Sequence, residues 1–325
     1  MLYARAFQAE STTRSRSFHR LSRSPVKISI IIPTYNASQC IEALLAKLNA
    51  QPLQEPEIII IDSSSEDRTI EMVKRFNVRL VSIPKAEFDH GGTRTKAGKM
   101  AAGDILVYLT QDALPAHEEA ITRLVAPFSD DKLIGVTFGR QLPHDDATPF
   151  AMYRRLFNYP EHSYTRGIDD KQLYGVKAAF CSNSFAAYRR SALEDVGWFR
   201  EKLVLAEDIH VAARMLMKGY RLAYVAEATV RHSHNYTAVQ ELKRYFDLGV
   251  FFERERWLLR EFGRPDGEGV RSVTGEVAFL RRRGQFHLIP MSLARAAARL
   301  IGYRLGLRHK VLPAGVVRRL SMYSA

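Results

Sequence analysis

Short apolar runs rich in β-branched residues alternate with polar turns along the N-terminal part of the chain. Three of these runs, 27–32, 57–61 and 105–109, end abruptly in small or polar residues. A near-continuous apolar run of this length is typical of a strand that is buried on both faces of a parallel sheet. Helices are predicted at 39–50 and 67–76, each following a strand. This alternation predicts an α/β fold with right-handed crossovers and a Rossmann-like, mostly parallel central sheet flanked by helices.

The alternation of strands and helices continues into the second half of the chain. Further strands are predicted at 78–83, 133–138, 180–188, 221–225 and 229–231, and further helices at 116–129, 205–218 and 238–262. Residues 141–178 are aromatic and irregular, and they form either one wall of a cleft or a packing insertion. We expect Gly302 and Gly306 to break a helix at 291–309, because glycine disfavours the helix interior.

The run at 105–109 leads directly into Thr110, Gln111 and Asp112, and a proline three residues later allows a helix to begin. Ligands of open α/β sheets bind beyond the carboxyl ends of the strands. Asp112 is therefore expected to project toward a ligand, where a carboxylate can hold a divalent cation that in turn binds phosphates. The alternative is an ordinary turn aspartate that caps the following helix.

Two other polar turns, 33–38 and 62–67, follow the first two strands and are expected at the same edge of the sheet as Asp112. Three polar turns at one edge predict a site of nucleotide size. No GxGxxG follows the first strand and no GxxxxGK[ST] occurs in the chain. These absences exclude a dinucleotide site of the dehydrogenase type and a P-loop.

Paired glycines and basic residues lie in the segment 88–99. Gly91 and Gly92 permit close approach of the backbone, and a helix that begins near Thr93 would direct free N–H groups at an anion. Arg94 would add positive charge at the same place. The alternative is a capped helix whose basic side chains are simply solvated.

Two pairs of titratable residues are further candidates for chemistry. Glu207 and Asp208 lie in the first turn of a predicted helix, where adjacent side chains point about 100° apart, so one carboxylate can face a cleft while the other pairs elsewhere. The alternative is that both acids only complement the helix dipole. His232 and His234 lie two residues apart on an extended segment, so both can reach one site. A pair of structural or exposed histidines is the alternative.

The composition is that of a folded globular protein of 325 residues, 46% hydrophobic and 26% charged. Cys40 and Cys181 are far apart and have no metal-binding spacing, which favours a reducing, cytoplasmic setting. No apolar stretch approaches about 18 residues, and the N-terminus lacks the apolar core of a signal peptide. Neither a membrane-spanning helix nor secretion is therefore expected.

The net charge of +13 is concentrated at the two ends of the chain. Residues 1–27 carry six basic and one acidic side chain, 270–325 carry eleven and one, and 28–269 sum to −2. The Ser- and Arg-rich residues 1–26 are predicted to be a disordered basic leader, and 263–325 a basic helical extension. Basic ends suit an anionic membrane surface. Because the charge is confined to the ends, we do not expect a nucleic-acid-binding protein.

Several of these segments, taken together, resemble a known family, the family 2 glycosyltransferases of the GT-A fold. The general motifs lie at 30–36, 60–67, 109–115 and 206–208. Five longer strings, at 88–94, 109–113, 139–144, 182–190 and 231–237, are similar to bacterial O-antigen rhamnosyltransferases. The likeness extends over residues 27–323 and implies a GT-A domain at 27–262.

The resemblance implies an inverting transfer of L-rhamnose from dTDP-β-L-rhamnose to a polyprenyl-diphosphate-linked oligosaccharide, in the synthesis of O-antigen or a related surface polysaccharide. It implies a cytoplasmic enzyme bound peripherally at the inner face of the cell membrane. A family 2 transferase that uses a UDP- or GDP-hexose is the alternative. A sugar nucleotidyltransferase would need a Gly-rich, Lys-containing loop where residues 33–36 stand, and a non-catalytic relative would be expected to lack Asp208.

The resemblance also implies roles for single residues at the matching positions. The residues expected to bind the donor are Pro33, Thr34, Asn36, Asp62, Arg94, Gln111 and Asp112. Arg94 would lie near the diphosphate, Asp112 and His232 would bind Mg²⁺ or Mn²⁺, and Asp208 would be the catalytic base. The first aspartate of the family's DxD metal motif is Thr110 here, so the chain offers the metal one fewer carboxylate.

Overall fold

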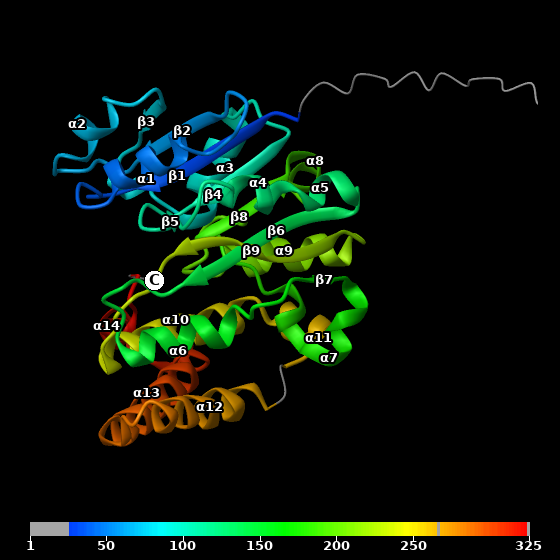
Figure 1. Ribbon diagram of the computed structural model, residues 1–325. Coiled ribbons are helices and arrows are strands. Elements are labelled where there is room, and N and C mark those ends of the chain that lie inside the picture. Colours follow the sequence, from blue (N-terminus) through cyan, green and yellow to red (C-terminus); the bar gives the residue numbers. More distant parts are fainter. Residues whose placement is uncertain (1–25, 265–266, 324–325) are drawn as a thin grey trace, which may run out of the picture.

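The structure is a computed structural model that describes residues 26–264 and 267–323, and one large mixed sheet with helices on both faces organises it (Figure 1). The leader predicted at 1–26 lies outside the described residues, apart from Val26. Within the described residues the nine strands, in order across the sheet, are β3 (Arg79–Ser82), β2 (Glu57–Asp62), β1 (Ile28–Thr34), β4 (Ile105–Leu109), β8 (Phe185–Arg189), β6 (Ile134–Leu142), β9 (Arg221–Arg231) and β5 (Leu114–Pro115), with β7 (Tyr164–Arg166) paired to β9.

Most strands of the sheet point in the same direction. β1 is parallel to β2 and β4, with Ile31 opposite Ile59 and Tyr108. β8 is antiparallel to both β4 and β6, and β6 is parallel to β9. The carboxyl ends of β1, β2, β4, β6 and β9 therefore share one edge of the sheet. The α/β prediction with a mostly parallel sheet is confirmed, and the strand expected at 180–188 is the antiparallel β8.

Two buried clusters fill the two faces of the sheet, because alternate strand residues point to opposite sides. Ile30 and Ile32 contribute to one cluster and Ile31 to the other. The helices over the first face are α1 (Ile41–Asn49), α2 (Thr69–Val73), α4 (Ala120–Val125) and α5 (Pro127–Asp130). The helices over the second are α3 (His90–Met100), α8 (Arg190–Asp195), α9 (Glu207–Met217), α10 (Ala238–Arg254) and α11 (Arg256–Phe262).

Three elements differ from the sequence-based expectation. α3 begins three residues earlier than predicted, because the Asp89 carboxylate caps it by accepting a hydrogen bond from the N–H of Gly92. The segment 141–178 is not irregular throughout, since it holds α6 (Pro149–Asn158) and a short helix, α7 (Lys171–Tyr174). The two strands predicted after Gly219 form one continuous strand, β9, whose pairing with β6 is irregular near its middle.

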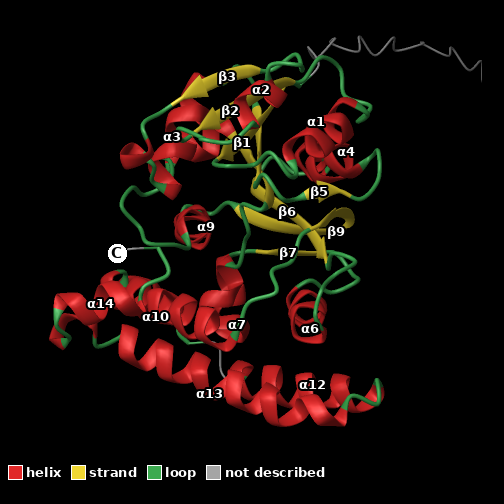
Figure 2. Cartoon of the chain, turned by 90° about the vertical axis from the view of Figure 1, so that its left-hand side faces the viewer, coloured by secondary structure: helices red, strands yellow, loops and turns green. Residues whose placement is uncertain are grey.

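The C-terminal helices form a further layer against α10, on the side away from the sheet (Figures 1 and 2). This layer consists of α12 (Glu268–Arg282) and α13 (Ile289–Gly306), whereas α14 (Ala314–Leu320) lies beside the end of α10 (Figure 2). The expected break is wrong at Gly302, which lies inside α13 where it packs against α10, whereas α13 does end at Gly306. A Cβ at either position would collide with the carbonyl oxygen of Leu242 or Phe246. The glycines allow the two helix backbones to approach closely.

Among residues 26–264 and 267–323, no helix is long and apolar enough to cross a membrane.

Candidate active site

A cavity of about 1800 Å³ lies where the carboxyl ends of the strands face the C-terminal helices. Its walls come from the turns after β1, β2 and β4, from α6 and the start of α9, from the segment after β9, and from α10, α12 and α13. Figure 2 shows α10 between the sheet and the layer formed by α12 and α13. The volume exceeds the roughly 300–1,000 Å³ typical of a pocket for one small molecule.

Hydrogen bonds tie the turns after β1 and β2 together at one end of the cavity. Thr34 Oγ1 donates to Asp62 Oδ2 at 2.8 Å, and Asp62 also accepts from the backbone and the hydroxyl of Ser65. Asn36 has a φ of 48° and accepts a backbone N–H from the second turn through its Oδ1. Pro33 and Thr34 line the cavity, whereas Asn36 and Asp62 lie in the turns behind its wall.

The side-chain amide of Gln111 forms two hydrogen bonds with the backbone of Tyr35, in the turn after β1. Its Oε1 accepts from the Tyr35 N–H at 2.9 Å, and its Nε2 donates to the Tyr35 carbonyl at 3.1 Å. The Lys85 ammonium lies 4.4 Å from the centroid of the Tyr35 ring. The two-point contact fixes an aromatic face and a cation at this end of the cavity.

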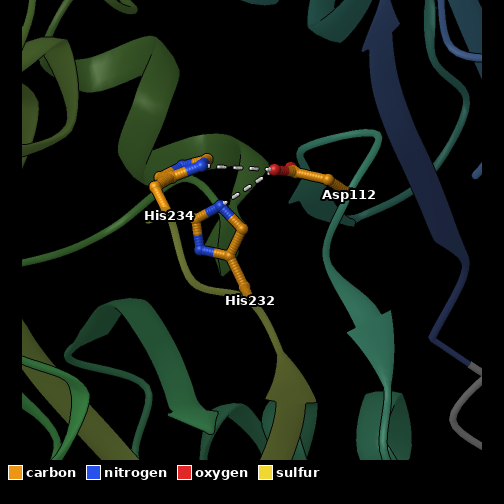
Figure 3. A group of neighbouring side chains, drawn as sticks. All are labelled: Asp112, His232 and His234. Atoms are coloured by element: carbon orange, nitrogen blue, oxygen red, sulfur yellow. Dashed lines mark ion pairs between the residues drawn. The ribbon is translucent and has the colours of Figure 1, made fainter. Parts of the chain in front are cut away.

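Asp112, from the turn after β4, faces His232 and His234, which follow β9 (Figure 3). Asp112 Oδ2 lies 3.4 Å from His232 Nε2 and 3.9 Å from His234 Nδ1. One ligand atom from each of the three residues lies within 4.8 Å of the others, a spacing that fits a single metal ion. The pairing of Leu114 with Arg231, between β5 and β9, holds the two segments side by side. Two imidazoles beside one carboxylate favour a first-row transition ion over Mg²⁺.

The tautomer of His232 follows from its neighbours. Arg155 can only donate hydrogen bonds, and it donates to Gln141 Oε1. His232 Nδ1 lies 2.9 Å from the same oxygen, so Nδ1 carries the proton and donates it to that bond. His232 Nε2 then turns a lone pair toward the Asp112 carboxylate, 3.4 Å away. Two acceptors that face each other need a cation between them, so the geometry fits a bound metal.

Burial keeps both histidines neutral at this site. It lowers the pKa of His232 against the opposing effect of Asp112. Burial, together with the neighbouring His232, lowers the pKa of His234 to about 4. Neutral imidazole is the form that binds a metal. Because the pKa of His232 is lowered, the ring is mostly unprotonated at neutral pH, and a metal ion is a better partner for the Asp112 carboxylate than a protonated His232.

The two acids at the start of α9 have different environments. Glu207 is buried, pairs with Arg94 at 3.2 Å and accepts from Asn183 Nδ2 at 3.0 Å. Burial is the largest single effect and opposes its ionisation, but Arg94, His90 and the hydrogen bond from Asn183 together outweigh burial and lower the pKa of Glu207. Asp208 lines the cavity, where it accepts the N–H groups of Asn183 at 3.1 Å and Ile209 at 2.8 Å. Burial and the Glu207 charge raise the pKa of Asp208 to about 7, the range in which a carboxylate works well as a general base.

Most of the residues singled out in the sequence meet at this cavity. Pro33, Thr34, Arg94, Gln111, Asp112, Asp208 and His232 line it. Glu207 neutralises the Arg94 guanidinium, and His234 joins Asp112 and His232, as its spacing allowed. No role was assigned to Gln141, although it lies in the string 139–144, and nothing in the sequence marks Arg155 as facing the cavity. The individual roles assigned to these side chains remain predictions.

The sequence matches known protein families and curated proteins. Residues 29–197 match the model described as glycosyl transferase family 2, and residues 162–316 match that of glycosyl transferase family group 2. The chain is 44% identical over 302 residues to the O-antigen chain rhamnosyltransferase RfbN of Salmonella typhimurium, with 92% of this chain and 96% of that protein covered. It is also 44% identical over 299 residues to the O-antigen chain rhamnosyltransferase WbaN of Salmonella anatum, with 91% and 94% covered.

Solved structures share the fold. The mannosyltransferase PcManGT from Pyrobaculum calidifontis, in complex with GDP-Man and Mn²⁺, superposes with a TM-score of 0.61 at 18% identity over 88% of each chain. A fragment of TarS from Staphylococcus aureus, in complex with UDP-GlcNAc, gives 0.52 at 18% identity over 87% of this chain and 91% of that one. At this level of identity the likeness concerns the arrangement of sheet and helices.

Proposed function

The chain belongs to glycosyl transferase family 2, and we propose that it transfers L-rhamnose from dTDP-β-L-rhamnose, with inversion, to a polyprenyl-diphosphate-linked oligosaccharide. It is a glycosyltransferase with the GT-A fold, and its similarity to O-antigen chain rhamnosyltransferases spans more than nine-tenths of its length. The observation that carries the proposal is the convergence of Asp208 and the group Asp112, His232 and His234 on one cavity. The volume of about 1800 Å³ leaves room for a donor and part of an acceptor.

The nucleoside of the donor is proposed to bind at the turns after β1 and β2. Asp62 accepts a hydrogen bond from Thr34 and so fixes the first turn, whose residues Pro33 and Thr34 line the cavity. Gln111 fixes Tyr35, and Lys85 lies against the Tyr35 ring. An aromatic face beside a cation suits a nucleobase followed by phosphate.

The diphosphate is proposed to bind beside Asp112, His232 and His234. A divalent cation held by these residues would neutralise the charge that gathers on the leaving dTDP. Gln141 holds His232 in the tautomer that offers Nε2 as a ligand. The second histidine also supplies a third protein ligand, which offsets the carboxylate that is lost where Thr110 replaces the first aspartate of the DxD motif.

Asp208 is proposed to take the proton of the acceptor hydroxyl as that oxygen attacks the anomeric carbon. The attacking oxygen forms its bond on the face opposite the departing diphosphate, so the configuration inverts. The neighbouring Glu207 stays ionised through Arg94, and its negative charge makes Asp208 a stronger base. The backbone N–H of Asn183 fixes the direction of the Asp208 carboxylate.

A panel of nucleotide sugars tests the donor. With Mn²⁺ and a lipid-linked acceptor extract, we expect dTDP-β-L-rhamnose to add one deoxyhexose to the acceptor, detected by mass spectrometry. UDP- and GDP-hexoses should show kcat/KM values at least about a hundredfold lower. A site built to hydrogen-bond one base and one sugar leaves its own polar groups unpaired when a different base or sugar binds. dTDP-glucose is the matched control that separates recognition of the sugar from recognition of the base. Comparable turnover from a UDP- or GDP-hexose would instead identify the alternative family 2 activity.

The outer face of α13 supports the proposal of an enzyme bound peripherally at the inner face of the membrane. Arg295 and Arg299 point inward and pair with Glu241 at 2.9 and 3.0 Å. The large apolar residues of α13 that are at least half exposed and do not line the cavity are Met291, Leu293 and Ile301. A helix that faces water normally exposes charged side chains and buries apolar ones. α13 does the opposite, so its outer face suits an apolar environment. The net charge of +10 in the surrounding residues 270–325 suits anionic lipid headgroups.

Vesicle binding tests this surface. We expect the protein to cosediment with vesicles that contain phosphatidylglycerol, more weakly with pure phosphatidylcholine, and more weakly again at high salt. Leu293→Glu and Ile301→Glu should each lower binding about tenfold or more, because burying such a side chain contributes about 1.5–3 kcal/mol. The matched control is Leu173→Glu, an equally drastic change at an 80% exposed leucine of α7 that should have no effect. Equal binding by all three variants would refute this membrane surface.

A further inference from the structure

Two arginines that no motif of the sequence points to face the cavity beside Asp112, His232 and His234. They are Arg155, from α6, and Arg244, from α10. Within residues 26–264 and 267–323, neither forms an ion pair with a carboxylate. A guanidinium that lines a cavity without a carboxylate partner keeps its positive charge and hydrogen-bond donors available, so it suits a negatively charged ligand.

Arg155 is held by neutral partners only. It donates to Gln141 Oε1, and its guanidinium carbon lies 5.5 Å from the centroid of the Tyr159 ring. Its Nε is buried without a hydrogen-bond partner. Burial lowers the pKa of Arg155, and the positive charge of nearby Arg244 lowers it further. Two guanidinium groups that repel each other across a cavity are stabilised by an anion placed between them.

Arg244 approaches the same place from the neighbouring helix α10. Its guanidinium carbon lies 5.9 Å from the centroid of the Tyr236 ring, and that ring stacks on His234 at 5.0 Å. Its guanidinium donates a hydrogen bond to the hydroxyl of Tyr323 at 3.1 Å. Arg244 is exposed within the cavity, so its remaining donors are free to reach a ligand.

Three buried arginines of the cavity wall differ from Arg155 and Arg244. Arg94 is neutralised by Glu207 at 3.2 Å, and Arg295 and Arg299 are neutralised by Glu241. These three have a carboxylate in reach and need no ligand. Arg94, the cation expected from the sequence to lie near the diphosphate, therefore has less charge to offer than Arg155 or Arg244.

We propose that Arg155 and Arg244 bind the diphosphate of the nucleotide donor, on the side opposite the metal-binding residues. This inference rests on the proposed function for the identity of the nucleotide, but the chemistry recognised is a diphosphate. Arg155 shares the Gln141 oxygen with His232, and Arg244 reaches His234 through Tyr236, so both arginines flank the residues that would hold the cation. When the glycosidic bond breaks, the electron pair stays on the diphosphate oxygen, and the two guanidinium groups stabilise that charge with fork-shaped hydrogen bonds.

Calorimetric titration tests the pair. The ligands are dTDP, UDP, GDP, the corresponding monophosphates, thymidine and inorganic diphosphate, each with Mn²⁺ present. We expect Arg155→Gln and Arg244→Gln each to weaken the binding of the preferred nucleoside diphosphate and of inorganic diphosphate about ten- to hundredfold. Thymidine should bind all variants equally, because it carries no phosphate. Arg264→Gln, at another arginine that lines the cavity, is the matched control and should change none of these affinities.

The diphosphate comparison keeps this inference separate from the identity of the donor. If GDP or UDP binds in place of dTDP and the variants still lose it, the donor assignment is wrong and the arginine assignment stands. Unchanged diphosphate affinity in Arg244→Gln, an exposed position where the fold is not at risk, would overturn the arginine assignment. So would normal dTDP affinity combined with a raised KM for the lipid-linked acceptor, since that result would assign the pair to the acceptor's diphosphate. A parent chain that binds no diphosphate would overturn both proposals.

Discussion

Replacing Asp208 by Asn is expected to lower kcat for sugar transfer by about 10²–10⁴-fold. Asparagine keeps the shape of the side chain and one acceptor for the N–H groups of Asn183 and Ile209, but it cannot take a proton from the acceptor hydroxyl. The measurement is initial-rate transfer of labelled sugar to a lipid-linked acceptor. Donor affinity should be nearly unchanged, because the base acts on the acceptor.

The same carboxyl makes both activity and stability depend on pH. Burial and the Glu207 charge raise the pKa of Asp208 to about 7, so kcat/KM of the parent should fall as the pH drops below about 7. A raised pKa means that the folded state binds this proton more tightly than the unfolded chain, whose aspartates titrate near 4. The stabilising contribution is therefore present below pH about 4 and is lost as the pH rises through about 7. Asp208→Asn should be at least as stable as the parent in urea unfolding above that pH.

An exposed acid provides the matched control for this substitution. Asp195→Asn changes a carboxylate that pairs with Lys218 at 3.4 Å on the surface, and transfer should be unaffected. Near-normal turnover by Asp208→Asn would remove Asp208 from the role of base. A fall in turnover accompanied by loss of the folded state would point to a structural role instead, and the urea measurement separates these two results.

Removing the metal is expected to have the second large effect. Transfer should fall at least about a hundredfold in chelator and return with Mn²⁺, because the cation contributes several kcal/mol at the leaving phosphate and about 1.4 kcal/mol changes a rate tenfold. Asp112→Asn should act in the same direction without altering shape, since it removes the only carboxylate of the group Asp112, His232 and His234. The measurements are transfer rates across a Mn²⁺ titration and direct Mn²⁺ binding by calorimetry.

Controls for the metal experiment follow from the structure. His287→Ala changes an exposed histidine outside the cavity and should alter neither Mn²⁺ affinity nor rate. Gln141→Leu frees the tautomer of His232 and should weaken Mn²⁺ binding about ten- to hundredfold, as loss of an outer-shell partner does. Full activity in chelator would contradict the metal role and leave Arg155 and Arg244 to stabilise the leaving group alone.

The sequence predicted the edge of the sheet at which the site lies, for a simple geometric reason. Parallel strands present their carboxyl ends together, so the polar turns after 28–34, 57–62 and 105–109 had to meet once the apolar runs were recognised as strands. Asp112 could be placed in this way from pattern alone. The helix at Glu207 and Asp208 could be predicted too, but the periodicity does not say which of the two acids lies buried against Arg94.

Contacts between distant segments explain what the sequence could not reveal. Arg155 lies in a segment without a clear pattern and Arg244 in a long helix, and only the packing of α6 and α10 under the sheet directs both into the cavity. The arginines of α13 appeared to spoil an amphipathic helix, yet Glu241 of α10 pairs with both of them and frees the outer face for apolar residues. Gly302 predicted a helix break because helix propensities describe an isolated helix. In the fold, the glycine instead allows α13 to contact the backbone of α10 closely.

The contact between Tyr323 and Arg244 has a practical consequence for handling the protein. Met322 N–H donates to Asp247 at 2.8 Å, and the Tyr323 ring, which lines the cavity, meets His90 edge-on at 5.7 Å. An affinity tag or reporter fused after residue 323 would emerge beside the cavity, where we expect it to interfere with binding of the proposed acceptor. Fusions made ahead of β1 leave from the opposite edge of the sheet, and this is where purification handles and surface-immobilisation anchors belong.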